Sequence, residues 1–186
     1  MMYHNPVLLN ESISGLKINP SGIYVDVTYG SGGHSQEILK NLNSNGKLIA
    51  FDQDQDAIEN KSNDSRLNLI KSNFKYLINF LNFFKIKEID GLLADFGISS
   101  HQIDNKNRGF STRFNSELDM RMNYSQKINA KIIINNYSKD QLKYIFKNFG
   151  ELKNYKKVTE KIISERKKKF INTTGDLKKI LAPLAK

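Results

Sequence analysis

A glycine-rich segment lies between two carboxylates in the first third of the chain. Gly30, Gly32 and Gly33 follow a short apolar run that contains Asp26, and Asp52 closes the next apolar run. Glycines between a strand and a helix let a ligand approach the backbone amides of the helix start, and an acid about twenty residues further on can bind ribose hydroxyls. The spacing indicates a site for a nucleotide-like cofactor.

The type of cofactor is narrowed by what the segment lacks. A dinucleotide fingerprint places a third glycine where this chain has Ser35, and residues 28–35 contain no Lys or Arg for a diphosphate. Asp26 before the loop favours a cationic ligand. S-adenosylmethionine, which carries a sulfonium, an ammonium and a ribose, meets these conditions better than a nicotinamide cofactor. The alternative is a glycine turn that only lets a helix and a strand pack closely.

Over the first hundred residues, short apolar runs alternate with segments whose apolar residues recur at helical spacing, and these elements must position the residues above. Apolar runs at 23–27, 48–51, 67–70 and 92–94 are typical of strands, and stripes at helical spacing lie between them (Ile38, Leu39 and Leu42; Ala57 and Ile58 after Asp56; Phe74, Leu77, Ile78, Leu81 and Phe84). The alternation predicts an α/β fold with a doubly wound parallel sheet. Ligands bind at the carboxyl ends of such strands, where Asp26, Asp52 and Asp95 fall.

The rest of the chain is predicted to be mostly helical. Ser138 and Gln141 have capping-box spacing before an apolar stripe at 142, 145, 146 and 149. Val158, Ile162 and Ile163 indicate a second helix with the basic run 166–169 in its last turn, and residues 173–176 can cap a third that carries Leu177, Ile180 and Leu181. We therefore expect two parts, 1–104 and 105–186, with an irregular stretch at about 105–129.

Charge separates the same two parts. Residues 1–104 contain 9 Lys and Arg against 12 Asp and Glu (net −3), whereas residues 105–186 contain 20 against 7 (net +13). A basic appendage indicates a polyanion such as nucleic acid, and a general bias of the genome towards lysine is the alternative. There is no cysteine, no signal-like N-terminus and no apolar run of membrane-spanning length, so we expect a cytoplasmic protein with no membrane association. His4 and His101 have no partners at metal-ligand spacing, and no metal is expected.

Five motifs together resemble the ribosomal RNA small subunit methyltransferase H family. They are His4-x-Pro6-Val7-Leu8-Leu9-x-Glu11, Tyr24-x-Asp26-x-Thr28-x-Gly30-x-Gly32-Gly33-His34-Ser35, Asp90-Gly91-x-Leu93-x-Asp95, Ser99-Ser100-x-Gln102-x-Asp104, and Arg108-Gly109-Phe110-Ser111 with Leu118-Asp119-Met120-Arg121-Met122. The resemblance implies a class I S-adenosylmethionine-dependent methyltransferase fold with a helical insertion. It also implies methylation of the exocyclic N4 of a cytidine in 16S rRNA, near the decoding centre of the small ribosomal subunit.

The same resemblance implies roles for individual residues. The cofactor contacts would be Gly32, Gly33, His34, Asp52, Phe74, Asp95 and Gln102, beside Asp26 and Gly30 from the local pattern. Phe74 would stack near the adenine, although periodicity alone makes it a core residue of its helix. Asp95 is also the candidate catalytic acceptor, but we favour a contact with the cofactor amine. Arg108, Phe110, Arg113 and Arg121 are candidate RNA contacts, with ordinary surface charge as the alternative.

One departure from the family pattern concerns the end of the chain. Family members resume the catalytic sheet after the helical insertion, whereas this sequence stops at Lys186. We expect only the first four strands, an exposed apolar edge at the fourth, and a chain that is a fragment or needs a partner such as a second copy. The alternative function is a non-catalytic RNA-binding or ribosome-assembly module.

Overall fold

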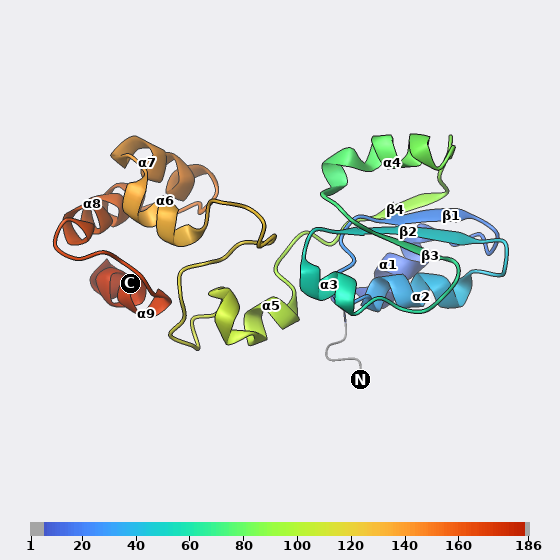
Figure 1. The fold of residues 1–186 in the computed structure, drawn as a ribbon, viewed down its shortest axis with the longest axis horizontal. Coiled ribbons are helices and arrows are strands. Elements are labelled where there is room, and N and C mark those ends of the chain that lie inside the picture. Colours follow the sequence, from blue (N-terminus) through green and yellow to red (C-terminus); the bar gives the residue numbers. More distant parts are fainter. Residues whose placement is uncertain (1–5, 185–186) are drawn as a thin grey trace. The chain divides into compact units, whose positions relative to one another are not determined.

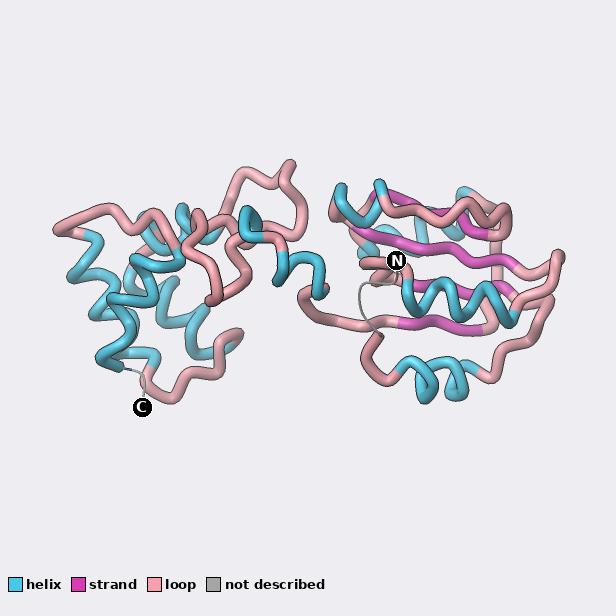
Figure 2. Tube along the Cα trace, turned by 90° about the horizontal axis from the view of Figure 1, so that it is seen from below, coloured by secondary structure: helices cyan, strands magenta, loops and turns pink. Residues whose placement is uncertain are grey.

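The computed structural model describes residues 6–184, so that His4 of the first motif and Lys186 lie outside the described part. The chain divides into two compact units between Ser99 and Ser100 (Figure 1). All the strands that the described residues form belong to the first unit, and the second unit is built from helices and irregular segments, as Figure 2 also shows.

The first unit contains the predicted parallel sheet. Its strands are β1 (Ile23–Asp26), β2 (Lys47–Asp52), β3 (Leu67–Lys71) and β4 (Gly91–Leu93), in the order β3-β2-β1-β4. All three pairings are parallel, which confirms the α/β prediction. The chain runs from β1 towards one edge and then returns to place β4 on the other side of β1. The strand order therefore reverses between β1 and β4, which is where ligands bind in folds of this class.

Helices cover both faces of this sheet. Figure 1 shows α1 (Leu9–Leu16), α2 (Gly33–Asn41) and α3 (Gln55–Glu59) on one face and α4 (Leu77–Phe83), which follows the 3₁₀ turn Phe74–Tyr76, on the other. Tyr24, Leu48 and Ala50 belong to the core on the α2 face, whereas the residues between them in the strands, such as Val25 and Ile49, pack towards α4. Both faces of the two central strands, β1 and β2, are buried, which is why these strands read as continuous apolar runs.

Two expectations for this unit need correction, and one helix was missed. The third helix begins at Gln55 and is capped by Asp54, which accepts a hydrogen bond from the amide of Asp56, so the helix starts before Asp56 rather than after it. Ile78 was expected on the core face of its helix but is 66% exposed, and Phe80 packs on the sheet against Phe51. Helix α1 was not predicted.

The second unit has its own apolar core. It comprises α5 (Ser100–Asp104), the 3₁₀ turn Lys106–Arg108, an irregular stretch, α6 (Ala130–Asn136), α7 (Lys139–Asn148), α8 (Tyr155–Arg166), α9 (Thr174–Leu181) and the 3₁₀ turn Ala182–Leu184. The buried apolar side chains of this core are Leu118, Ile134, Leu142, Val158, Ile162 and Ile171. The predicted capping box is present at Ser138 with Gln141, and the predicted cap at residues 173–176 is a second capping box, formed by Thr173 with Asp176.

Other details of the second unit differ from the expectation. Phe149 ends the predicted stripe of α7, yet its side chain is 74% exposed. Helix α8 ends at Arg166 and Lys167 is its C-cap, so most of the basic run follows the helix instead of forming its last turn. Helices α5 and α6 were not predicted.

The exposed edge at the fourth strand is present. Within the described residues β4 pairs only with β1, and Leu92 in this strand is 45% exposed. Within residues 6–184 no further strand pairs with the free edge of β4.

Candidate cofactor site at the carboxyl edge of the sheet

The glycine segment forms a compact turn between β1 and α2. Gly30 and Gly32 have φ angles of 54° and 82°, in the left-handed region that L side chains rarely adopt. The amide of Gly32 donates to the carbonyl of Tyr29 at 2.8 Å, and the amide of Tyr29 donates to the carbonyl of Phe51 at 3.0 Å. A side chain at position 32 would also meet the Tyr29 hydroxyl. The two glycines are therefore required for this turn whatever it binds.

Asp26 holds the turn from inside. Its side chain is fully buried, and its carboxylate accepts hydrogen bonds from the Ser35 hydroxyl at 2.7 Å and the Thr28 amide at 2.9 Å. Burial raises the pKa of Asp26 above its ordinary value, and these hydrogen bonds oppose that shift. In this geometry Asp26 orders the loop and the start of α2 and presents no oxygen to solvent.

Asp52 lies at the end of β2 and has a different environment. Its two carboxylate oxygens accept from the amides of Gly30 at 2.8 Å and Asp54 at 2.9 Å, and the residue is only partly buried. A carboxylate oxygen has a second lone pair, so each can accept a further hydrogen bond. Asp52 therefore fastens the glycine turn to β2 and still offers an acceptor at the carboxyl edge.

Asp95 follows β4 and is joined to the same turn through its backbone. The amide of Asp95 donates to the hydroxyl of Thr28 at 2.8 Å, and Thr28 in turn bonds Asp26. The carboxylate of Asp95 is exposed, and no hydrogen bond or ion pair reaches it from the described residues. The ends of β1, β2 and β4 are thus tied into one hydrogen-bonded unit with two accessible acids.

Two aromatic rings meet at this edge, one from the loop after each outer strand of the sheet. Phe74 comes after β3 and Phe96 after β4, and their ring centroids are 5.6 Å apart. Phe74 is 40% exposed and Phe96 is 71% exposed. Because β3 and β4 are the two outer strands, this contact spans the ends of β2 and β1. Phe74 is thus a surface ring rather than the core residue that periodicity suggested. The contact of Phe96 with this ring was not predicted.

The remaining loop residues contact the N-terminal segment. The Nε2 atom of His34 lies 3.1 Å from the carbonyl oxygen of Val7, so this nitrogen carries the proton. His34 is only 7% exposed, and a Cβ on Gly33 would lie 2.3 Å from Pro6. Both residues therefore dock the segment before α1 onto α2. The contact with Pro6 had no sequence signal, and contacts of His34 and Gly33 with a cofactor stay predictions.

These residues fit S-adenosylmethionine by their chemistry. An acceptor at the end of β2 suits ribose hydroxyls, an exposed ring suits a base, and an exposed acid at the end of β4 suits a positively charged amine. The loop contains no cation that would favour a diphosphate. Gly30, Gly32, Asp52, Phe74 and Asp95 meet at one edge of the first unit, whereas Gln102 belongs to the second unit.

Gln102 is buried in the second unit beside the irregular stretch. It is 6% exposed, and its amide nitrogen donates to the sulfur of Met122 at 3.3 Å. The side chain fixes α5 to residue 122, and a contact with a cofactor stays a prediction.

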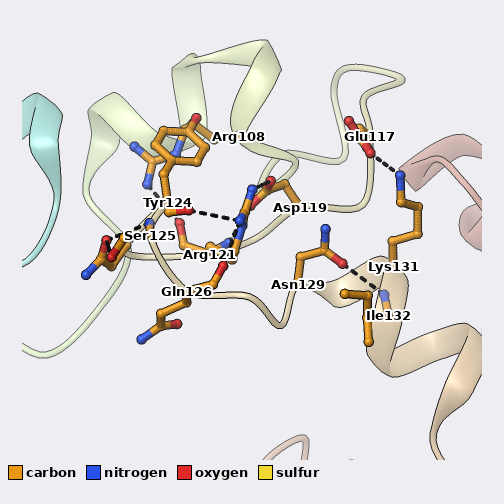
Figure 3. A network of polar contacts seen from close by, with 11 residues as sticks. Arg108, Glu117, Asp119, Arg121, Tyr124, Ser125, Gln126, Asn129, Lys131 and Ile132 are labelled. Atoms are coloured by element: carbon orange, nitrogen blue, oxygen red, sulfur yellow. Dashed lines mark hydrogen bonds and ion pairs between the residues drawn. The ribbon is translucent and has the colours of Figure 1, made fainter.

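The four predicted RNA contacts do not share one environment. Arg108 is fully buried, donates to the carbonyl of Arg121 at 2.9 Å and lies over the ring of Tyr124 at 4.5 Å. Arg121 forms a two-pronged ion pair with Asp119 at 2.6 and 2.9 Å and donates to the carbonyls of Tyr124 and Gln126 (Figure 3). In this structure both arginines hold the irregular stretch together, because their donors are turned towards the protein.

Arg113 and Phe110 are more accessible. The Arg113 side chain is 59% exposed, although its guanidinium pairs with Asp104 and lies 5.6 Å from the ring of Phe114. Phe110 is partly buried beside Arg108. Of the four, Arg113 has the geometry that best suits contact with an outside partner.

Two negative findings concern the described residues. Between residues 6 and 184 no group of three or more His, Cys, Asp or Glu side chains is arranged to hold a metal ion. No helix in that range is both long and apolar enough to cross a membrane.

Comparisons with known proteins identify relatives of the chain. The chain is 56% identical over 184 residues to the ribosomal RNA small subunit methyltransferase H of Christiangramia forsetii, an alignment that covers 99% of the chain and 61% of the relative. The proteins of the same name from Flavobacterium johnsoniae and Bacteroides thetaiotaomicron are 52% and 47% identical, with 97% and 99% of the chain and 60% of each relative covered. The chain thus spans about three fifths of the length of these relatives.

A family model matches almost the whole sequence. The match covers residues 1–185 and is described as the MraW methylase family. Together with the identities above, it shows that this chain belongs to the MraW methylase family.

Proposed function

We propose that the chain forms the methyl-donor part of an S-adenosylmethionine-dependent methyltransferase that modifies the exocyclic N4 of a cytidine in 16S rRNA, near the decoding centre. The observation that carries the proposal is the hydrogen-bonded edge at which the glycine turn, Asp52 and Asp95 meet. The names of the relatives supply the substrate class, ribosomal RNA of the small subunit. The partner would be a small subunit in the cytoplasm.

Each residue of the edge has a distinct task in this proposal. Asp52 accepts from the ribose hydroxyls, Phe74 stacks on the adenine, and Asp95 accepts from the ammonium group. S-adenosylmethionine supplies a methyl group that its sulfonium already activates. The protein has to hold the donor carbon and the acceptor nitrogen in line at about 3 Å and to exclude water. Correct orientation of the two reactants alone accelerates such a transfer greatly.

The acceptor nitrogen is the harder partner, because the lone pair of a cytosine amine is delocalised into the ring. A base flipped out of its stack would place that amine at the carboxyl edge, beyond β4. A hydrogen-bond acceptor beside N4 then stabilises the positive charge that develops on nitrogen. We assign Asp95 to the cofactor amine rather than to the amine of the cytosine.

Calorimetry with the purified chain tests the first part of this proposal. We expect saturable binding of S-adenosylmethionine and no binding of a nicotinamide dinucleotide. Transfer of a labelled methyl group to small subunits that lack the modification tests the second part. RNA binding with no binding of S-adenosylmethionine would instead favour a non-catalytic RNA-binding or assembly module.

A further inference from the structure

An exposed pair of aromatic rings lies at the C-terminal end of α7. Tyr144 is 60% exposed and Phe149 is 74% exposed, and their ring centroids are 5.8 Å apart in an edge-to-face arrangement. Neither belongs to the core of the second unit, to which α7 contributes Leu142 and Phe146. These two rings therefore lie on the surface with no packing task in the core.

The aromatic surface continues onto α8 through a lysine. Lys147 is three residues after Tyr144 on α7, a spacing that puts both on one helix face. Its Nζ atom lies 6.0 Å from the ring centroid of Tyr155, the first residue of α8. Phe149, Tyr144, Lys147 and Tyr155 thus form a continuous surface, which we call the α7–α8 strip.

The backbone that presents this strip is firmly held. The amide of Gly150 donates to the carbonyl of Ile145 at 3.1 Å, and that of Leu152 donates to Phe146 at 3.0 Å. Tyr155 is anchored by a bond from its amide to the carbonyl of Leu152 at 3.3 Å. A ligand would therefore meet rings whose supporting backbone is already ordered, which lowers the entropic cost of binding.

The lysines of this region separate into two groups. Lys139, Lys143 and Lys161 pair with Glu160, Asp140 and Glu165 at 3.0 to 3.2 Å. The lysines of the strip and its border form no ion pair with any described carboxylate, and all are exposed (Lys147, Lys153, Lys156 and Lys157). Between residues 143 and 157 the only acid is Glu151. The cations that surround the rings are therefore available to an anionic ligand.

We propose that the α7–α8 strip binds single-stranded RNA, with unpaired bases stacked on Tyr144 and Phe149 and the bordering lysines on phosphates. Flat exposed rings interleaved with unneutralised cations are what single-stranded nucleic acid requires, whereas an acidic protein would need the cations alone. The proposal rests on the proposed function, since it names the surface by which the second unit holds rRNA. It places RNA binding away from Arg108 and Arg121, whose donors face the protein.

The test uses the full chain and a fluorescently labelled, unstructured oligoribonucleotide. Removing both rings (Tyr144→Ala with Phe149→Ala) is expected to lower affinity by about tenfold or more, because base stacking on aromatic residues contributes strongly to such binding. Replacing Lys153, Lys156 and Lys157 with Gln is expected to reduce the slope of log affinity against log salt by about 2, since each phosphate contact with a single strand contributes about 0.7.

The first unit offers a matched control. Phe83 is 77% exposed, its ring lies edge-on to that of Phe84 at 5.3 Å, and Lys85 and Lys87 follow it. Glu88 and Asp90 neutralise that region. Replacing Phe83 with Ala and these two lysines with Gln should leave RNA affinity and its salt dependence unchanged. Circular dichroism and hydrogen exchange would show that all variants are folded.

Two results would overturn the proposal. One is unchanged RNA affinity in the folded variant that lacks both rings. If that variant keeps its RNA affinity and loses binding to a ribosomal protein instead, the proposal is likewise overturned. The other is an equal loss in the control from the first unit. Binding of S-adenosylmethionine is measured in the same samples. Absence of this binding would count against the proposed function and not against RNA binding by the α7–α8 strip.

Discussion

Asp26 and Asp52 close adjacent strands but have opposite environments. Asp26 is fully buried and uses its carboxylate on Ser35 and Thr28 within the protein. Asp52 is partly buried and holds two backbone amides while it keeps acceptor capacity towards solvent. Removing the first should therefore cost stability of the loop, and removing the second should cost binding.

The substitution Asp52→Asn separates charge from shape. The side-chain oxygen of Asn can still accept from one of the two backbone amides. The variant loses the charge-assisted hydrogen bonds that a carboxylate accepts from ribose hydroxyls, and such bonds are about twice as strong as neutral ones. We expect affinity for S-adenosylmethionine to fall by about tenfold or more in calorimetry.

Asp90 provides the control for that experiment. It also bonds a backbone amide, that of Ile23 at 2.8 Å, but it precedes β4 at the amino ends of the strands. Asp90→Asn should leave cofactor affinity within about twofold. Equal losses in the two variants would contradict the role of Asp52.

Residue types alone could not separate contact residues from those that hold the structure. The position of Asp52 and Asp95 at one edge could be predicted, because the carboxyl ends of parallel strands meet there, whereas their contact with a cofactor stays a prediction. The sequence could not show that Arg108 and Arg121 are turned inward. Their guanidinium groups donate to backbone carbonyls, and a carbonyl acceptor has no sequence signature. One local signal existed, since the spacing Asp119-x-Arg121 permits an ion pair within the stretch.

At the scale of elements, the strands were predictable and three helices, α1, α5 and α6, were not. Parallel strands buried on both faces give short apolar runs, and all four were located within a residue or two. Helix α6 contains three successive isoleucines, which favour a strand, and it is stabilised by packing of Ile133 and Ile134 into the core and by the cap at Asn129. Helix α1 has no side-chain cap and contains Ser and Gly, so its sequence carries little helical signal.

The irregular stretch depends on an ion pair in the second unit. Asp119 is 8% exposed, and the hydrogen bonds that Arg121 donates hold its pKa below the ordinary value of 3.8. Because the pKa is lowered by folding, the pair stabilises the folded state above about pH 4 and loses this effect as pH falls through the lowered pKa. Asp119→Asn should reduce the free energy of unfolding at neutral pH by about 1.5 to 3 kcal/mol.

Urea unfolding between pH 7 and pH 3 measures this effect. The difference between the natural chain and Asp119→Asn should be constant down to about pH 4 and shrink below it. Asp140→Asn is the control, because the Asp140 side chain is 90% exposed and its pair with Lys143 should contribute less than about 0.5 kcal/mol. A difference that grows as pH falls would contradict this account.

Gly109 lies in a tight turn of the same irregular stretch. Its φ is 74°, and a Cβ there would lie 2.4 Å from the carbonyl oxygen of Glu117, a backbone atom that cannot move cheaply. We expect Gly109→Ala to destabilise the second unit by at least about 2 kcal/mol, from backbone strain and the clash together. Thermal unfolding checks this against Gly97→Ala, which meets nothing within 4 Å and should change little.

At the scale of the whole molecule, the division into two units has a measurable consequence. The residues at the carboxyl edge lie in residues 1–99, whereas Gln102 lies in residues 100–186 and is engaged with Met122. A ligand stabilises only the part of a protein that it binds, by about 2.7 kcal/mol at a hundredfold excess over its dissociation constant. Hydrogen exchange resolves such stabilisation segment by segment.

We therefore expect S-adenosylmethionine to slow exchange in β1, β2 and the loops after them, and to leave α7 and α8 unchanged. Gly109→Ala should do the reverse, with faster exchange in the second unit and unchanged protection of the sheet. Cofactor-dependent protection of α5 would show that Gln102 joins the site, as the family resemblance implies. Protection of α5 without any in the loop after β1 would contradict the cofactor site, because Gly30 and Asp52 would then lie outside the region that the ligand touches.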